Sequence, residues 1–110
     1  MLDAPEITMP DDEQMSVLLD RYLNNPRDPG AAVEMARQPE VTARYLEGFI
    51  TSGRLAGLDV RSRVHIFALI GIACRHAEQN LLEKWSKVEE DGNLKQVLYR
   101  KLRMLLGQDT

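Results

Sequence analysis

The chain has 110 residues, of which 44% are hydrophobic and 28% are charged, and its formal net charge at pH 7 is −3. This length fits one domain, and the hydrophobic fraction is that of a globular protein, so we do not expect disorder of the whole chain. The acidic balance argues against non-specific binding to nucleic acid or to anionic lipid.

The N-terminal part of the chain is its most acidic part. The first twenty residues hold six acidic side chains and no basic one, which leaves fourteen basic and eleven acidic side chains for the remainder. We expect residues 1–9 to form a flexible acidic segment, residues 10–107 to form one all-α domain, and residues 108–110 to form a tail.

The single cysteine indicates the redox state of the cellular compartment in which the protein works. Cys74 cannot form an internal disulfide, and it lies in the most apolar part of the chain, which fits a reducing environment. The N-terminus has neither the basic nor the apolar stretch of a secretory signal. No apolar run approaches the ~18–20 residues that cross a bilayer. These features predict a cytoplasmic protein without a membrane partner.

Helical periodicity recurs along the chain, whereas strand signals are nearly absent. Pro10 and the three carboxylates after it predict a helix start, because proline suits the first turn and carboxylates favour the positive end of the dipole. Asp28-Pro29 predicts a short second helix over 29–37, and a third helix covers 40–52. The apolar stripes of the first and third helices predict core positions at Met15, Leu18, Leu19, Tyr22, Leu23, Val41, Tyr45, Leu46, Phe49 and Ile50.

The segment 60–76 is apolar around most of a helical circumference, and Asp59 is its expected N-cap. A helix that is apolar all round is either buried or spans a membrane. Its arginines make a membrane span too costly, at ~2.5–3.5 kcal/mol for each one near the centre. The sequence therefore predicts that 60–76 is the central buried helix of the domain.

Two further helices are expected towards the C-terminus. One covers 78–90, separate from or continuous with the helix before it, and places Leu81, Trp85 and Val88 on one face. The other covers 94–106, after a break at Gly92.

These elements predict an all-α, single-domain bundle of about five to six helices arranged as helical hairpins. Both an orthogonal bundle and a stack that resembles tetratricopeptide (TPR) or HEAT repeats in architecture fit this pattern. No self-similarity near the periods of about 34 or 40 residues supports a true repeat.

The histidines and the cysteine do not suggest a reactive site. His65 and His76 would lie roughly 16 Å apart along one helix, which is too far for two ligands of one metal ion. Apolar surroundings would raise the pKa of Cys74 and make it inert. Neither a catalytic triad nor a glycine-rich phosphate loop is present. We expect no catalytic residue, metal or cofactor, and hence no enzyme.

The C-terminal helix has more apolar surface than packing against one neighbour requires, and such a surplus can bind another chain. We therefore predict a protein-binding module that acts without catalysis, as an adaptor, a secretion-type chaperone or an inhibitor or immunity protein. The partner is another protein, or a second copy in a homodimer. The candidate protein-binding residues are Val97, Leu98, Tyr99, Leu102, Met104 and Leu106.

A nucleic-acid-binding regulator is the alternative hypothesis. Arg61, Arg63 and His65 occupy the first turns of a helix that follows another helix, as in a helix-turn-helix element around residues 47–66. Against it, the connector is longer than the usual three or four residues, and the helix becomes apolar after His65. The sequence identifies neither the partner nor the oligomeric state.

Overall fold

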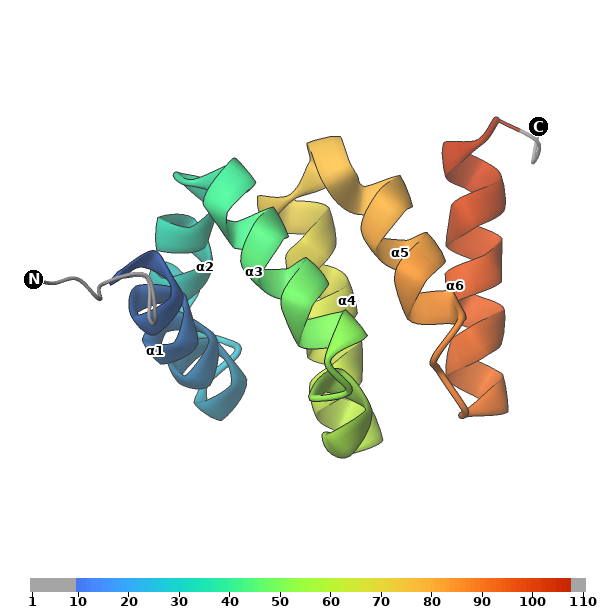
Figure 1. The fold of residues 1–110 in the computed structure, drawn as a ribbon, viewed down its shortest axis with the longest axis horizontal. Coiled ribbons are helices and arrows are strands. Elements are labelled where there is room, and N and C mark those ends of the chain that lie inside the picture. The colour runs from blue at the N-terminus through green and yellow to red at the C-terminus, as the bar shows by residue number, and fades with distance from the viewer. Residues whose placement is uncertain (1–9, 108–110) are drawn as a thin grey trace, which may run out of the picture.

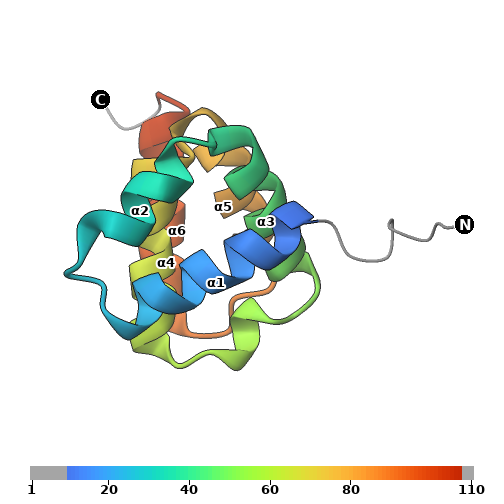
Figure 2. The same cartoon turned by 90° about the vertical axis from the view of Figure 1, so that its left-hand side faces the viewer.

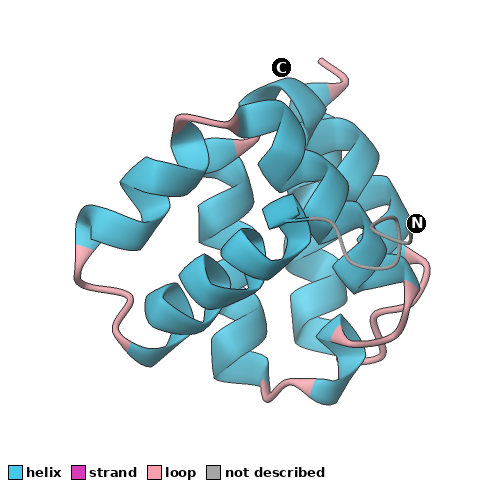
Figure 3. Ribbon diagram, turned by 60° about the vertical axis from the view of Figure 1, so that its left-hand side comes forward, coloured by secondary structure: helices cyan, strands magenta, loops and turns pink. Residues whose placement is uncertain are grey.

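The computed structural model describes residues 10–107, and within them the chain forms six α-helices and two short 3-10 turns without a strand. The prediction of an all-α domain is therefore confirmed for this part of the chain (Figures 1 and 3). The elements are α1 (Pro10–Asn24), α2 (Pro29–Ala36), α3 (Pro39–Thr51), η2 (Leu55–Gly57), α4 (Val60–Ala73), η3 (Arg75–Ala77), α5 (Glu78–Ser86) and α6 (Gly92–Leu105).

Aspartate side chains start three of the helices. The Asp28 carboxylate accepts from the backbone N–H of Gly30 at 3.0 Å and begins α2. Asp59 accepts from Ser62 N–H at 2.9 Å, and Asp91 accepts from Leu94 N–H at 2.9 Å, at the starts of α4 and α6. Each cap satisfies a backbone donor that the first turn of a helix leaves unpaired.

The boundaries of the fourth and fifth helices differ from the prediction. The helix expected over 60–76 ends at Ala73, and Cys74 has a non-helical backbone (φ −133°, ψ 42°). The chain then turns through η3, so α4 and α5 are separate helices (Figure 1). This break turns the chain back so that α5 packs against α3.

The helix expected over 78–90 ends at Ser86, and Val88 is exposed rather than part of the core. Just beyond the end of the helix, the Glu89 carboxylate accepts a hydrogen bond from the indole Nε1 of Trp85 at 2.8 Å.

Some helices pack against the next helix in the sequence, and others pack against helices further along the chain. α1 packs against α2, and α5 packs against α6, while α3 contacts α5 and α2 contacts α4. Seen from the α1 end, α1 crosses the front of the molecule with α2 on one side and α3 on the other (Figure 2). At the opposite end, α6 has α5 as its principal neighbour (Figure 1).

One hydrophobic core joins all six helices. Trp85 is fully buried in it and meets the ring of Phe67 edge-on, with 6.3 Å between ring centroids. The buried Thr42 hydroxyl donates to the Met35 carbonyl at 2.8 Å, which joins the start of α3 to the end of α2. A buried hydroxyl is tolerated there because it has this partner.

The position of α4 corrects one prediction. α4 contacts α1, α2, α3 and α5, but only one side of it is buried. Val60, Val64 and Ile72 are exposed, Ile72 by 58%. The prediction of a helix buried all round is therefore wrong for this outer face, because no other described helix covers it. The buried side consists of Ile66, Leu69, Ile70 and Ala73.

Two isoleucines in α4 provide a matched test of this one-sided burial. Ile70→Ala should lower the free energy of unfolding by about 2–5 kcal/mol, because it removes a fully buried side chain and leaves a cavity. Ile72→Ala should change it by less than about 0.5 kcal/mol, because Ile72 is on the exposed face. Urea denaturation followed by circular dichroism measures both values, and equal losses would contradict the orientation of α4.

Candidate functional site

The helix α6 buries one stripe of its surface and exposes the rest. Leu94, Leu98 and Leu102 face the core. Two of the predicted protein-binding residues therefore belong to the core, since Leu98 is 0% exposed and Leu102 only 8%. Their side chains hold α6 against the rest of the domain and do not present a surface to a partner.

The other four predicted binding residues are exposed, three of them on α6 and Leu106 at its C-cap. Val97 and Met104 lie seven residues apart on one flank of the buried stripe, and Tyr99 and Leu106 lie seven apart on the other. Between 40% and 56% of each residue's surface is exposed. Arg100 and Arg103 are also exposed. The α6 outer surface consists of Val97, Tyr99, Arg100, Arg103, Met104 and Leu106.

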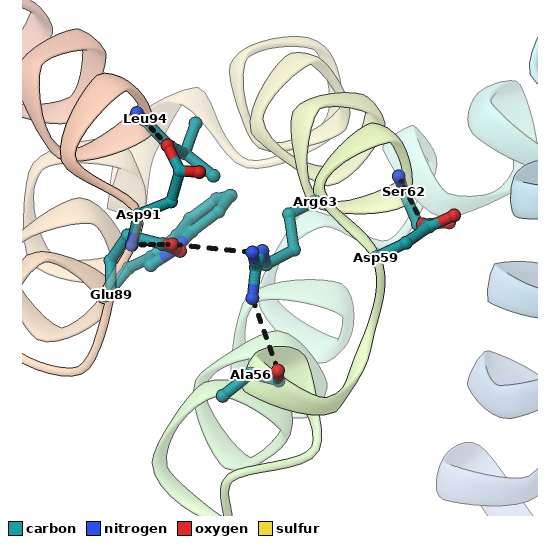
Figure 4. A network of polar contacts seen from close by, with 8 residues as sticks. Ala56, Asp59, Ser62, Arg63, Glu89, Asp91 and Leu94 are labelled. Atoms are coloured by element: carbon teal, nitrogen blue, oxygen red, sulfur yellow. Dashed lines mark hydrogen bonds and ion pairs between the residues drawn. The ribbon is translucent and has the colours of Figure 1, made fainter.

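A buried carboxylate fixes the start of α6 (Figure 4). Glu89 accepts from Trp85 Nε1 at 2.8 Å and from the backbone N–H of Asp91 at 2.9 Å. Its Oε2 lies 3.7 Å from Nη2 of Arg63, and the two side chains are only 1% and 13% exposed. Asp91 in turn caps α6, so the orientation of this helix depends on the contacts of Glu89.

A second ion pair holds α6 further along its length. Lys101 Nζ lies 3.7 Å from Oε2 of Glu78, the buried first residue of α5. This pair and the Glu89 contacts hold α6 at two points, so the α6 outer surface is carried on a fixed support.

The alternative, nucleic-acid-binding residues are not brought together as one free basic surface. Arg61 is exposed, but Arg63 pairs with Glu89 and donates from Nη1 to the Ala56 carbonyl at 3.2 Å. The His65 ring is half-buried and meets the ring of Tyr22 edge-on, and Tyr22 Oη donates to the His65 carbonyl at 2.9 Å. Within the 47–66 element, the connector contains the 3-10 turn η2, which separates the two helices.

Cys74 and His76 differ in their exposure to solvent. Cys74 is fully buried, and this burial raises the pKa of its thiol to about 11. His76 is exposed. Among residues 10–107, no three His, Cys, Asp or Glu side chains form a group that could hold a metal ion. The same residues include no helix long and apolar enough to cross a membrane.

A groove that the sequence did not predict lies where the end of α1, the following loop, α2 and α4 meet. Its volume is about 420 Å³. The α4 contribution is Ile72, whose exposure follows only from the packing of α4 and cannot be inferred from the apolar sequence around it. The α2–α4 groove is lined by Tyr22, Pro26, Arg27, Pro29, Ala32, Val33, Ala36, Arg37 and Ile72.

Comparison of the chain with protein-family models, with curated proteins and with solved structures found no match. The function proposed below therefore rests on the geometry of the described residues.

The environment of Cys74 predicts its chemical behaviour. Because burial raises its pKa, the thiol stays protonated at pH 8, and we expect a thiol reagent to react with it only after denaturation. The folded state also binds the thiol proton more tightly than the unfolded state does, so stability should fall as pH rises from about 9 to about 11. Titration with Ellman's reagent measures the accessibility, and reaction in the native state at the rate of a free thiol would contradict this burial.

The role of Glu89 can be tested with its neighbour as a control. Glu89→Ala should lower the free energy of unfolding by about 3 kcal/mol, because it leaves the largely buried Arg63 charge and the Trp85 N–H without their acceptor. Glu90→Ala, at an exposed position, should change it by less than about 0.5 kcal/mol. Urea denaturation measures both, and similar values for the two variants would show that the Glu89 contacts do not stabilise the fold.

Proposed function

We propose that this protein is a protein-binding module that associates stoichiometrically with another protein through the α6 outer surface, without catalysis. The observation that carries the proposal is the exposure of four large apolar side chains on and just after a helix that also contributes three leucines to the core. They are Val97, Tyr99, Met104 and, at the C-cap, Leu106. Single exposed apolar residues are common on protein surfaces, whereas here two pairs of them flank one helix, and exposed apolar residues that gather in this way support an interaction site.

The arrangement of the helices supports this role for α6. We interpret the consecutive pairs α1–α2, α3–α4 and α5–α6 as three helical hairpins stacked through the α3–α5 and α2–α4 contacts, with the architecture of a short TPR-like or HEAT-like stack. In such a stack each hairpin covers the next, and the helix at the end has a side that no neighbour covers. α6 occupies this terminal position (Figure 1).

The side chains of the α6 outer surface indicate the chemistry of the partner. Tyr99 offers an aromatic ring with a hydroxyl group, and Met104 offers a flexible thioether that adapts to different shapes. Arg100 and Arg103 place positive charge beside them. We therefore propose an amphipathic helix with acidic residues along its edges as the partner element. The free, buried Cys74 fits a reducing compartment, and we place this association in the cytoplasm.

The nucleic-acid alternative has weaker support than the protein-binding proposal. It requires Arg61, Arg63 and His65 to act together, whereas Arg63 is engaged by Glu89 and Ala56. No further observation favours it.

The proposal is tested with substitutions at the exposed apolar positions of α6. Proteins retained from a cell extract by the immobilised chain, with and without nuclease, are identified, and each is then purified and titrated against the chain by calorimetry. We expect a one-to-one complex that Tyr99→Glu with Met104→Glu weakens at least about tenfold, because charge is introduced into an apolar contact. Val17→Glu is the matched control, since Val17 is equally exposed but lies on α1.

Two results would contradict this proposal. One is retention that nuclease abolishes, which would point to nucleic acid instead. The other is a purified complex that the double variant binds as tightly as the unsubstituted chain does. Light scattering over a range of concentrations distinguishes a homodimer from a complex with a different protein.

A further inference from the structure

The α2–α4 groove lies at the opposite end of the row of helices from α6. In Figure 1, α1 and α2 are at the left of the molecule and α6 is at the right. The groove shares no residue with the α6 outer surface. The groove is therefore separate from the surface that carries the proposed function.

The walls of the groove are apolar and held in place. Pro26 and Pro29 restrict the backbone of the loop that forms one wall. Ala32 and Ala36 are one helical turn apart on α2, where their small side chains leave the groove open. The Tyr22 ring is buried, and its hydroxyl is fixed by the hydrogen bond to His65. A site formed in advance loses little conformational entropy when it binds.

Two exposed apolar side chains border the groove. Val33 comes from α2 and Ile72 from α4, so the apolar surface extends across both helices. An elongated segment that crosses from α2 to α4 would cover both side chains as well as the alanines between them. A peptide segment has this shape and can place apolar side chains at regular intervals along it.

The charges around the groove indicate what such a segment carries. Arg27 and Arg37 are the charged residues of the lining, and both are exposed. Arg37 Nη1 lies 3.4 Å from Oε2 of Glu34, but both side chains are largely exposed to water. An exposed pair of this kind contributes little stability, so a carboxylate of a bound segment can take its place. Arginine binds carboxylates in a planar geometry with two parallel hydrogen bonds.

We propose that the α2–α4 groove is a second docking site, which binds a short segment of a partner protein. The segment inserts apolar side chains between Val33 and Ile72 and places carboxylates on Arg27 and Arg37. With partners bound at both the α6 outer surface and this groove, the protein would connect two other proteins.

Peptide display tests this proposal, since a selection from random peptides does not require the sequence of the natural segment. A random dodecapeptide library is selected on the intact protein and depleted on the Val33→Glu, Ile72→Glu double variant. Both substitutions are at exposed positions, and the melting temperature of the variant, measured by circular dichroism, checks that it is folded. Peptides that survive depletion are synthesised with a fluorescent label, and their dissociation constants are measured by fluorescence polarisation.

We expect the surviving peptides to combine apolar residues with Asp or Glu. Arg37→Glu should weaken their binding at least about tenfold, and replacement of their acidic residues by lysine should do the same. Met104→Glu and Val17→Glu should leave binding unchanged, because neither residue lines the groove. The effect of Met104→Glu also separates this proposal from the one for α6.

Three results would overturn the proposal. These are the absence of peptides that distinguish the protein from the double variant, enrichment of basic or uncharged peptides, and equal affinity for the Arg37→Glu variant. Should the double variant not fold, the single variants Val33→Glu and Ile72→Glu replace it in the depletion step, so that Arg37→Glu remains an independent test.

Discussion

The buried carboxylate of Glu89 joins two parts of the chain that are far apart in sequence, the turn before α6 and the first turns of α4. It accepts hydrogen bonds from the Trp85 indole and the Asp91 backbone, and it lies beside Arg63, which itself reaches the carbonyl of Ala56. The turn between α5 and α6 and the first turns of α4 therefore meet at Glu89, and Arg63 links them to the connector before α4. A charge removed from water is costly unless its surroundings supply hydrogen bonds and an opposite charge, and here they supply both. The position of α6, and with it the orientation of the α6 outer surface, depends on these contacts of Glu89 with Trp85, Asp91 and Arg63, which we call the Glu89 joint.

Both proposed interaction surfaces exist because helices are covered on one side only. α6 is at the end of the row and packs chiefly on α5, while α4 has neighbours on its inner side and none among the described helices on its outer face. The core already contains Trp85 and leucines from five helices, and the apolar side chains on these uncovered sides are not part of it. Retaining them exposed has no benefit for folding alone.

Local signals in the sequence predicted local structure well. Asp28, Asp59 and the prolines marked helix starts, because each acts within a few residues of its own position. The start of the last helix was predicted two residues too late, because Gly92 was interpreted as a break, whereas it is the first residue of α6 and Asp91 is the cap. The stripe of the first helix predicted Met15, Leu18, Leu19, Tyr22 and Leu23 as core residues; the first four are buried, and Leu23 is partly buried against the core. Features that depend on distant segments were not predictable in this way. The end of α4 at Ala73 has no glycine or proline to mark it, the pairing of Arg63 with Glu89 spans two helices, and the α2–α4 groove forms only when the end of α1 meets α2 and α4. The division of α6 into buried Leu98 and Leu102 and exposed Tyr99 and Met104 likewise depends on where α5 packs.

The place of Trp85 in the Glu89 joint has a spectroscopic consequence. Trp85 is the single tryptophan of the chain, and its indole is fully buried with its N–H bonded to a carboxylate. Emission excited at wavelengths that tyrosine does not absorb therefore arises from this one point, between α4, α5 and the start of α6. A red shift would report water entering the joint even while the helical content of the chain stays constant. The protein thus contains an intrinsic fluorophore that reports whether the start of α6 is packed against α4 and α5. No label on either proposed binding surface is needed.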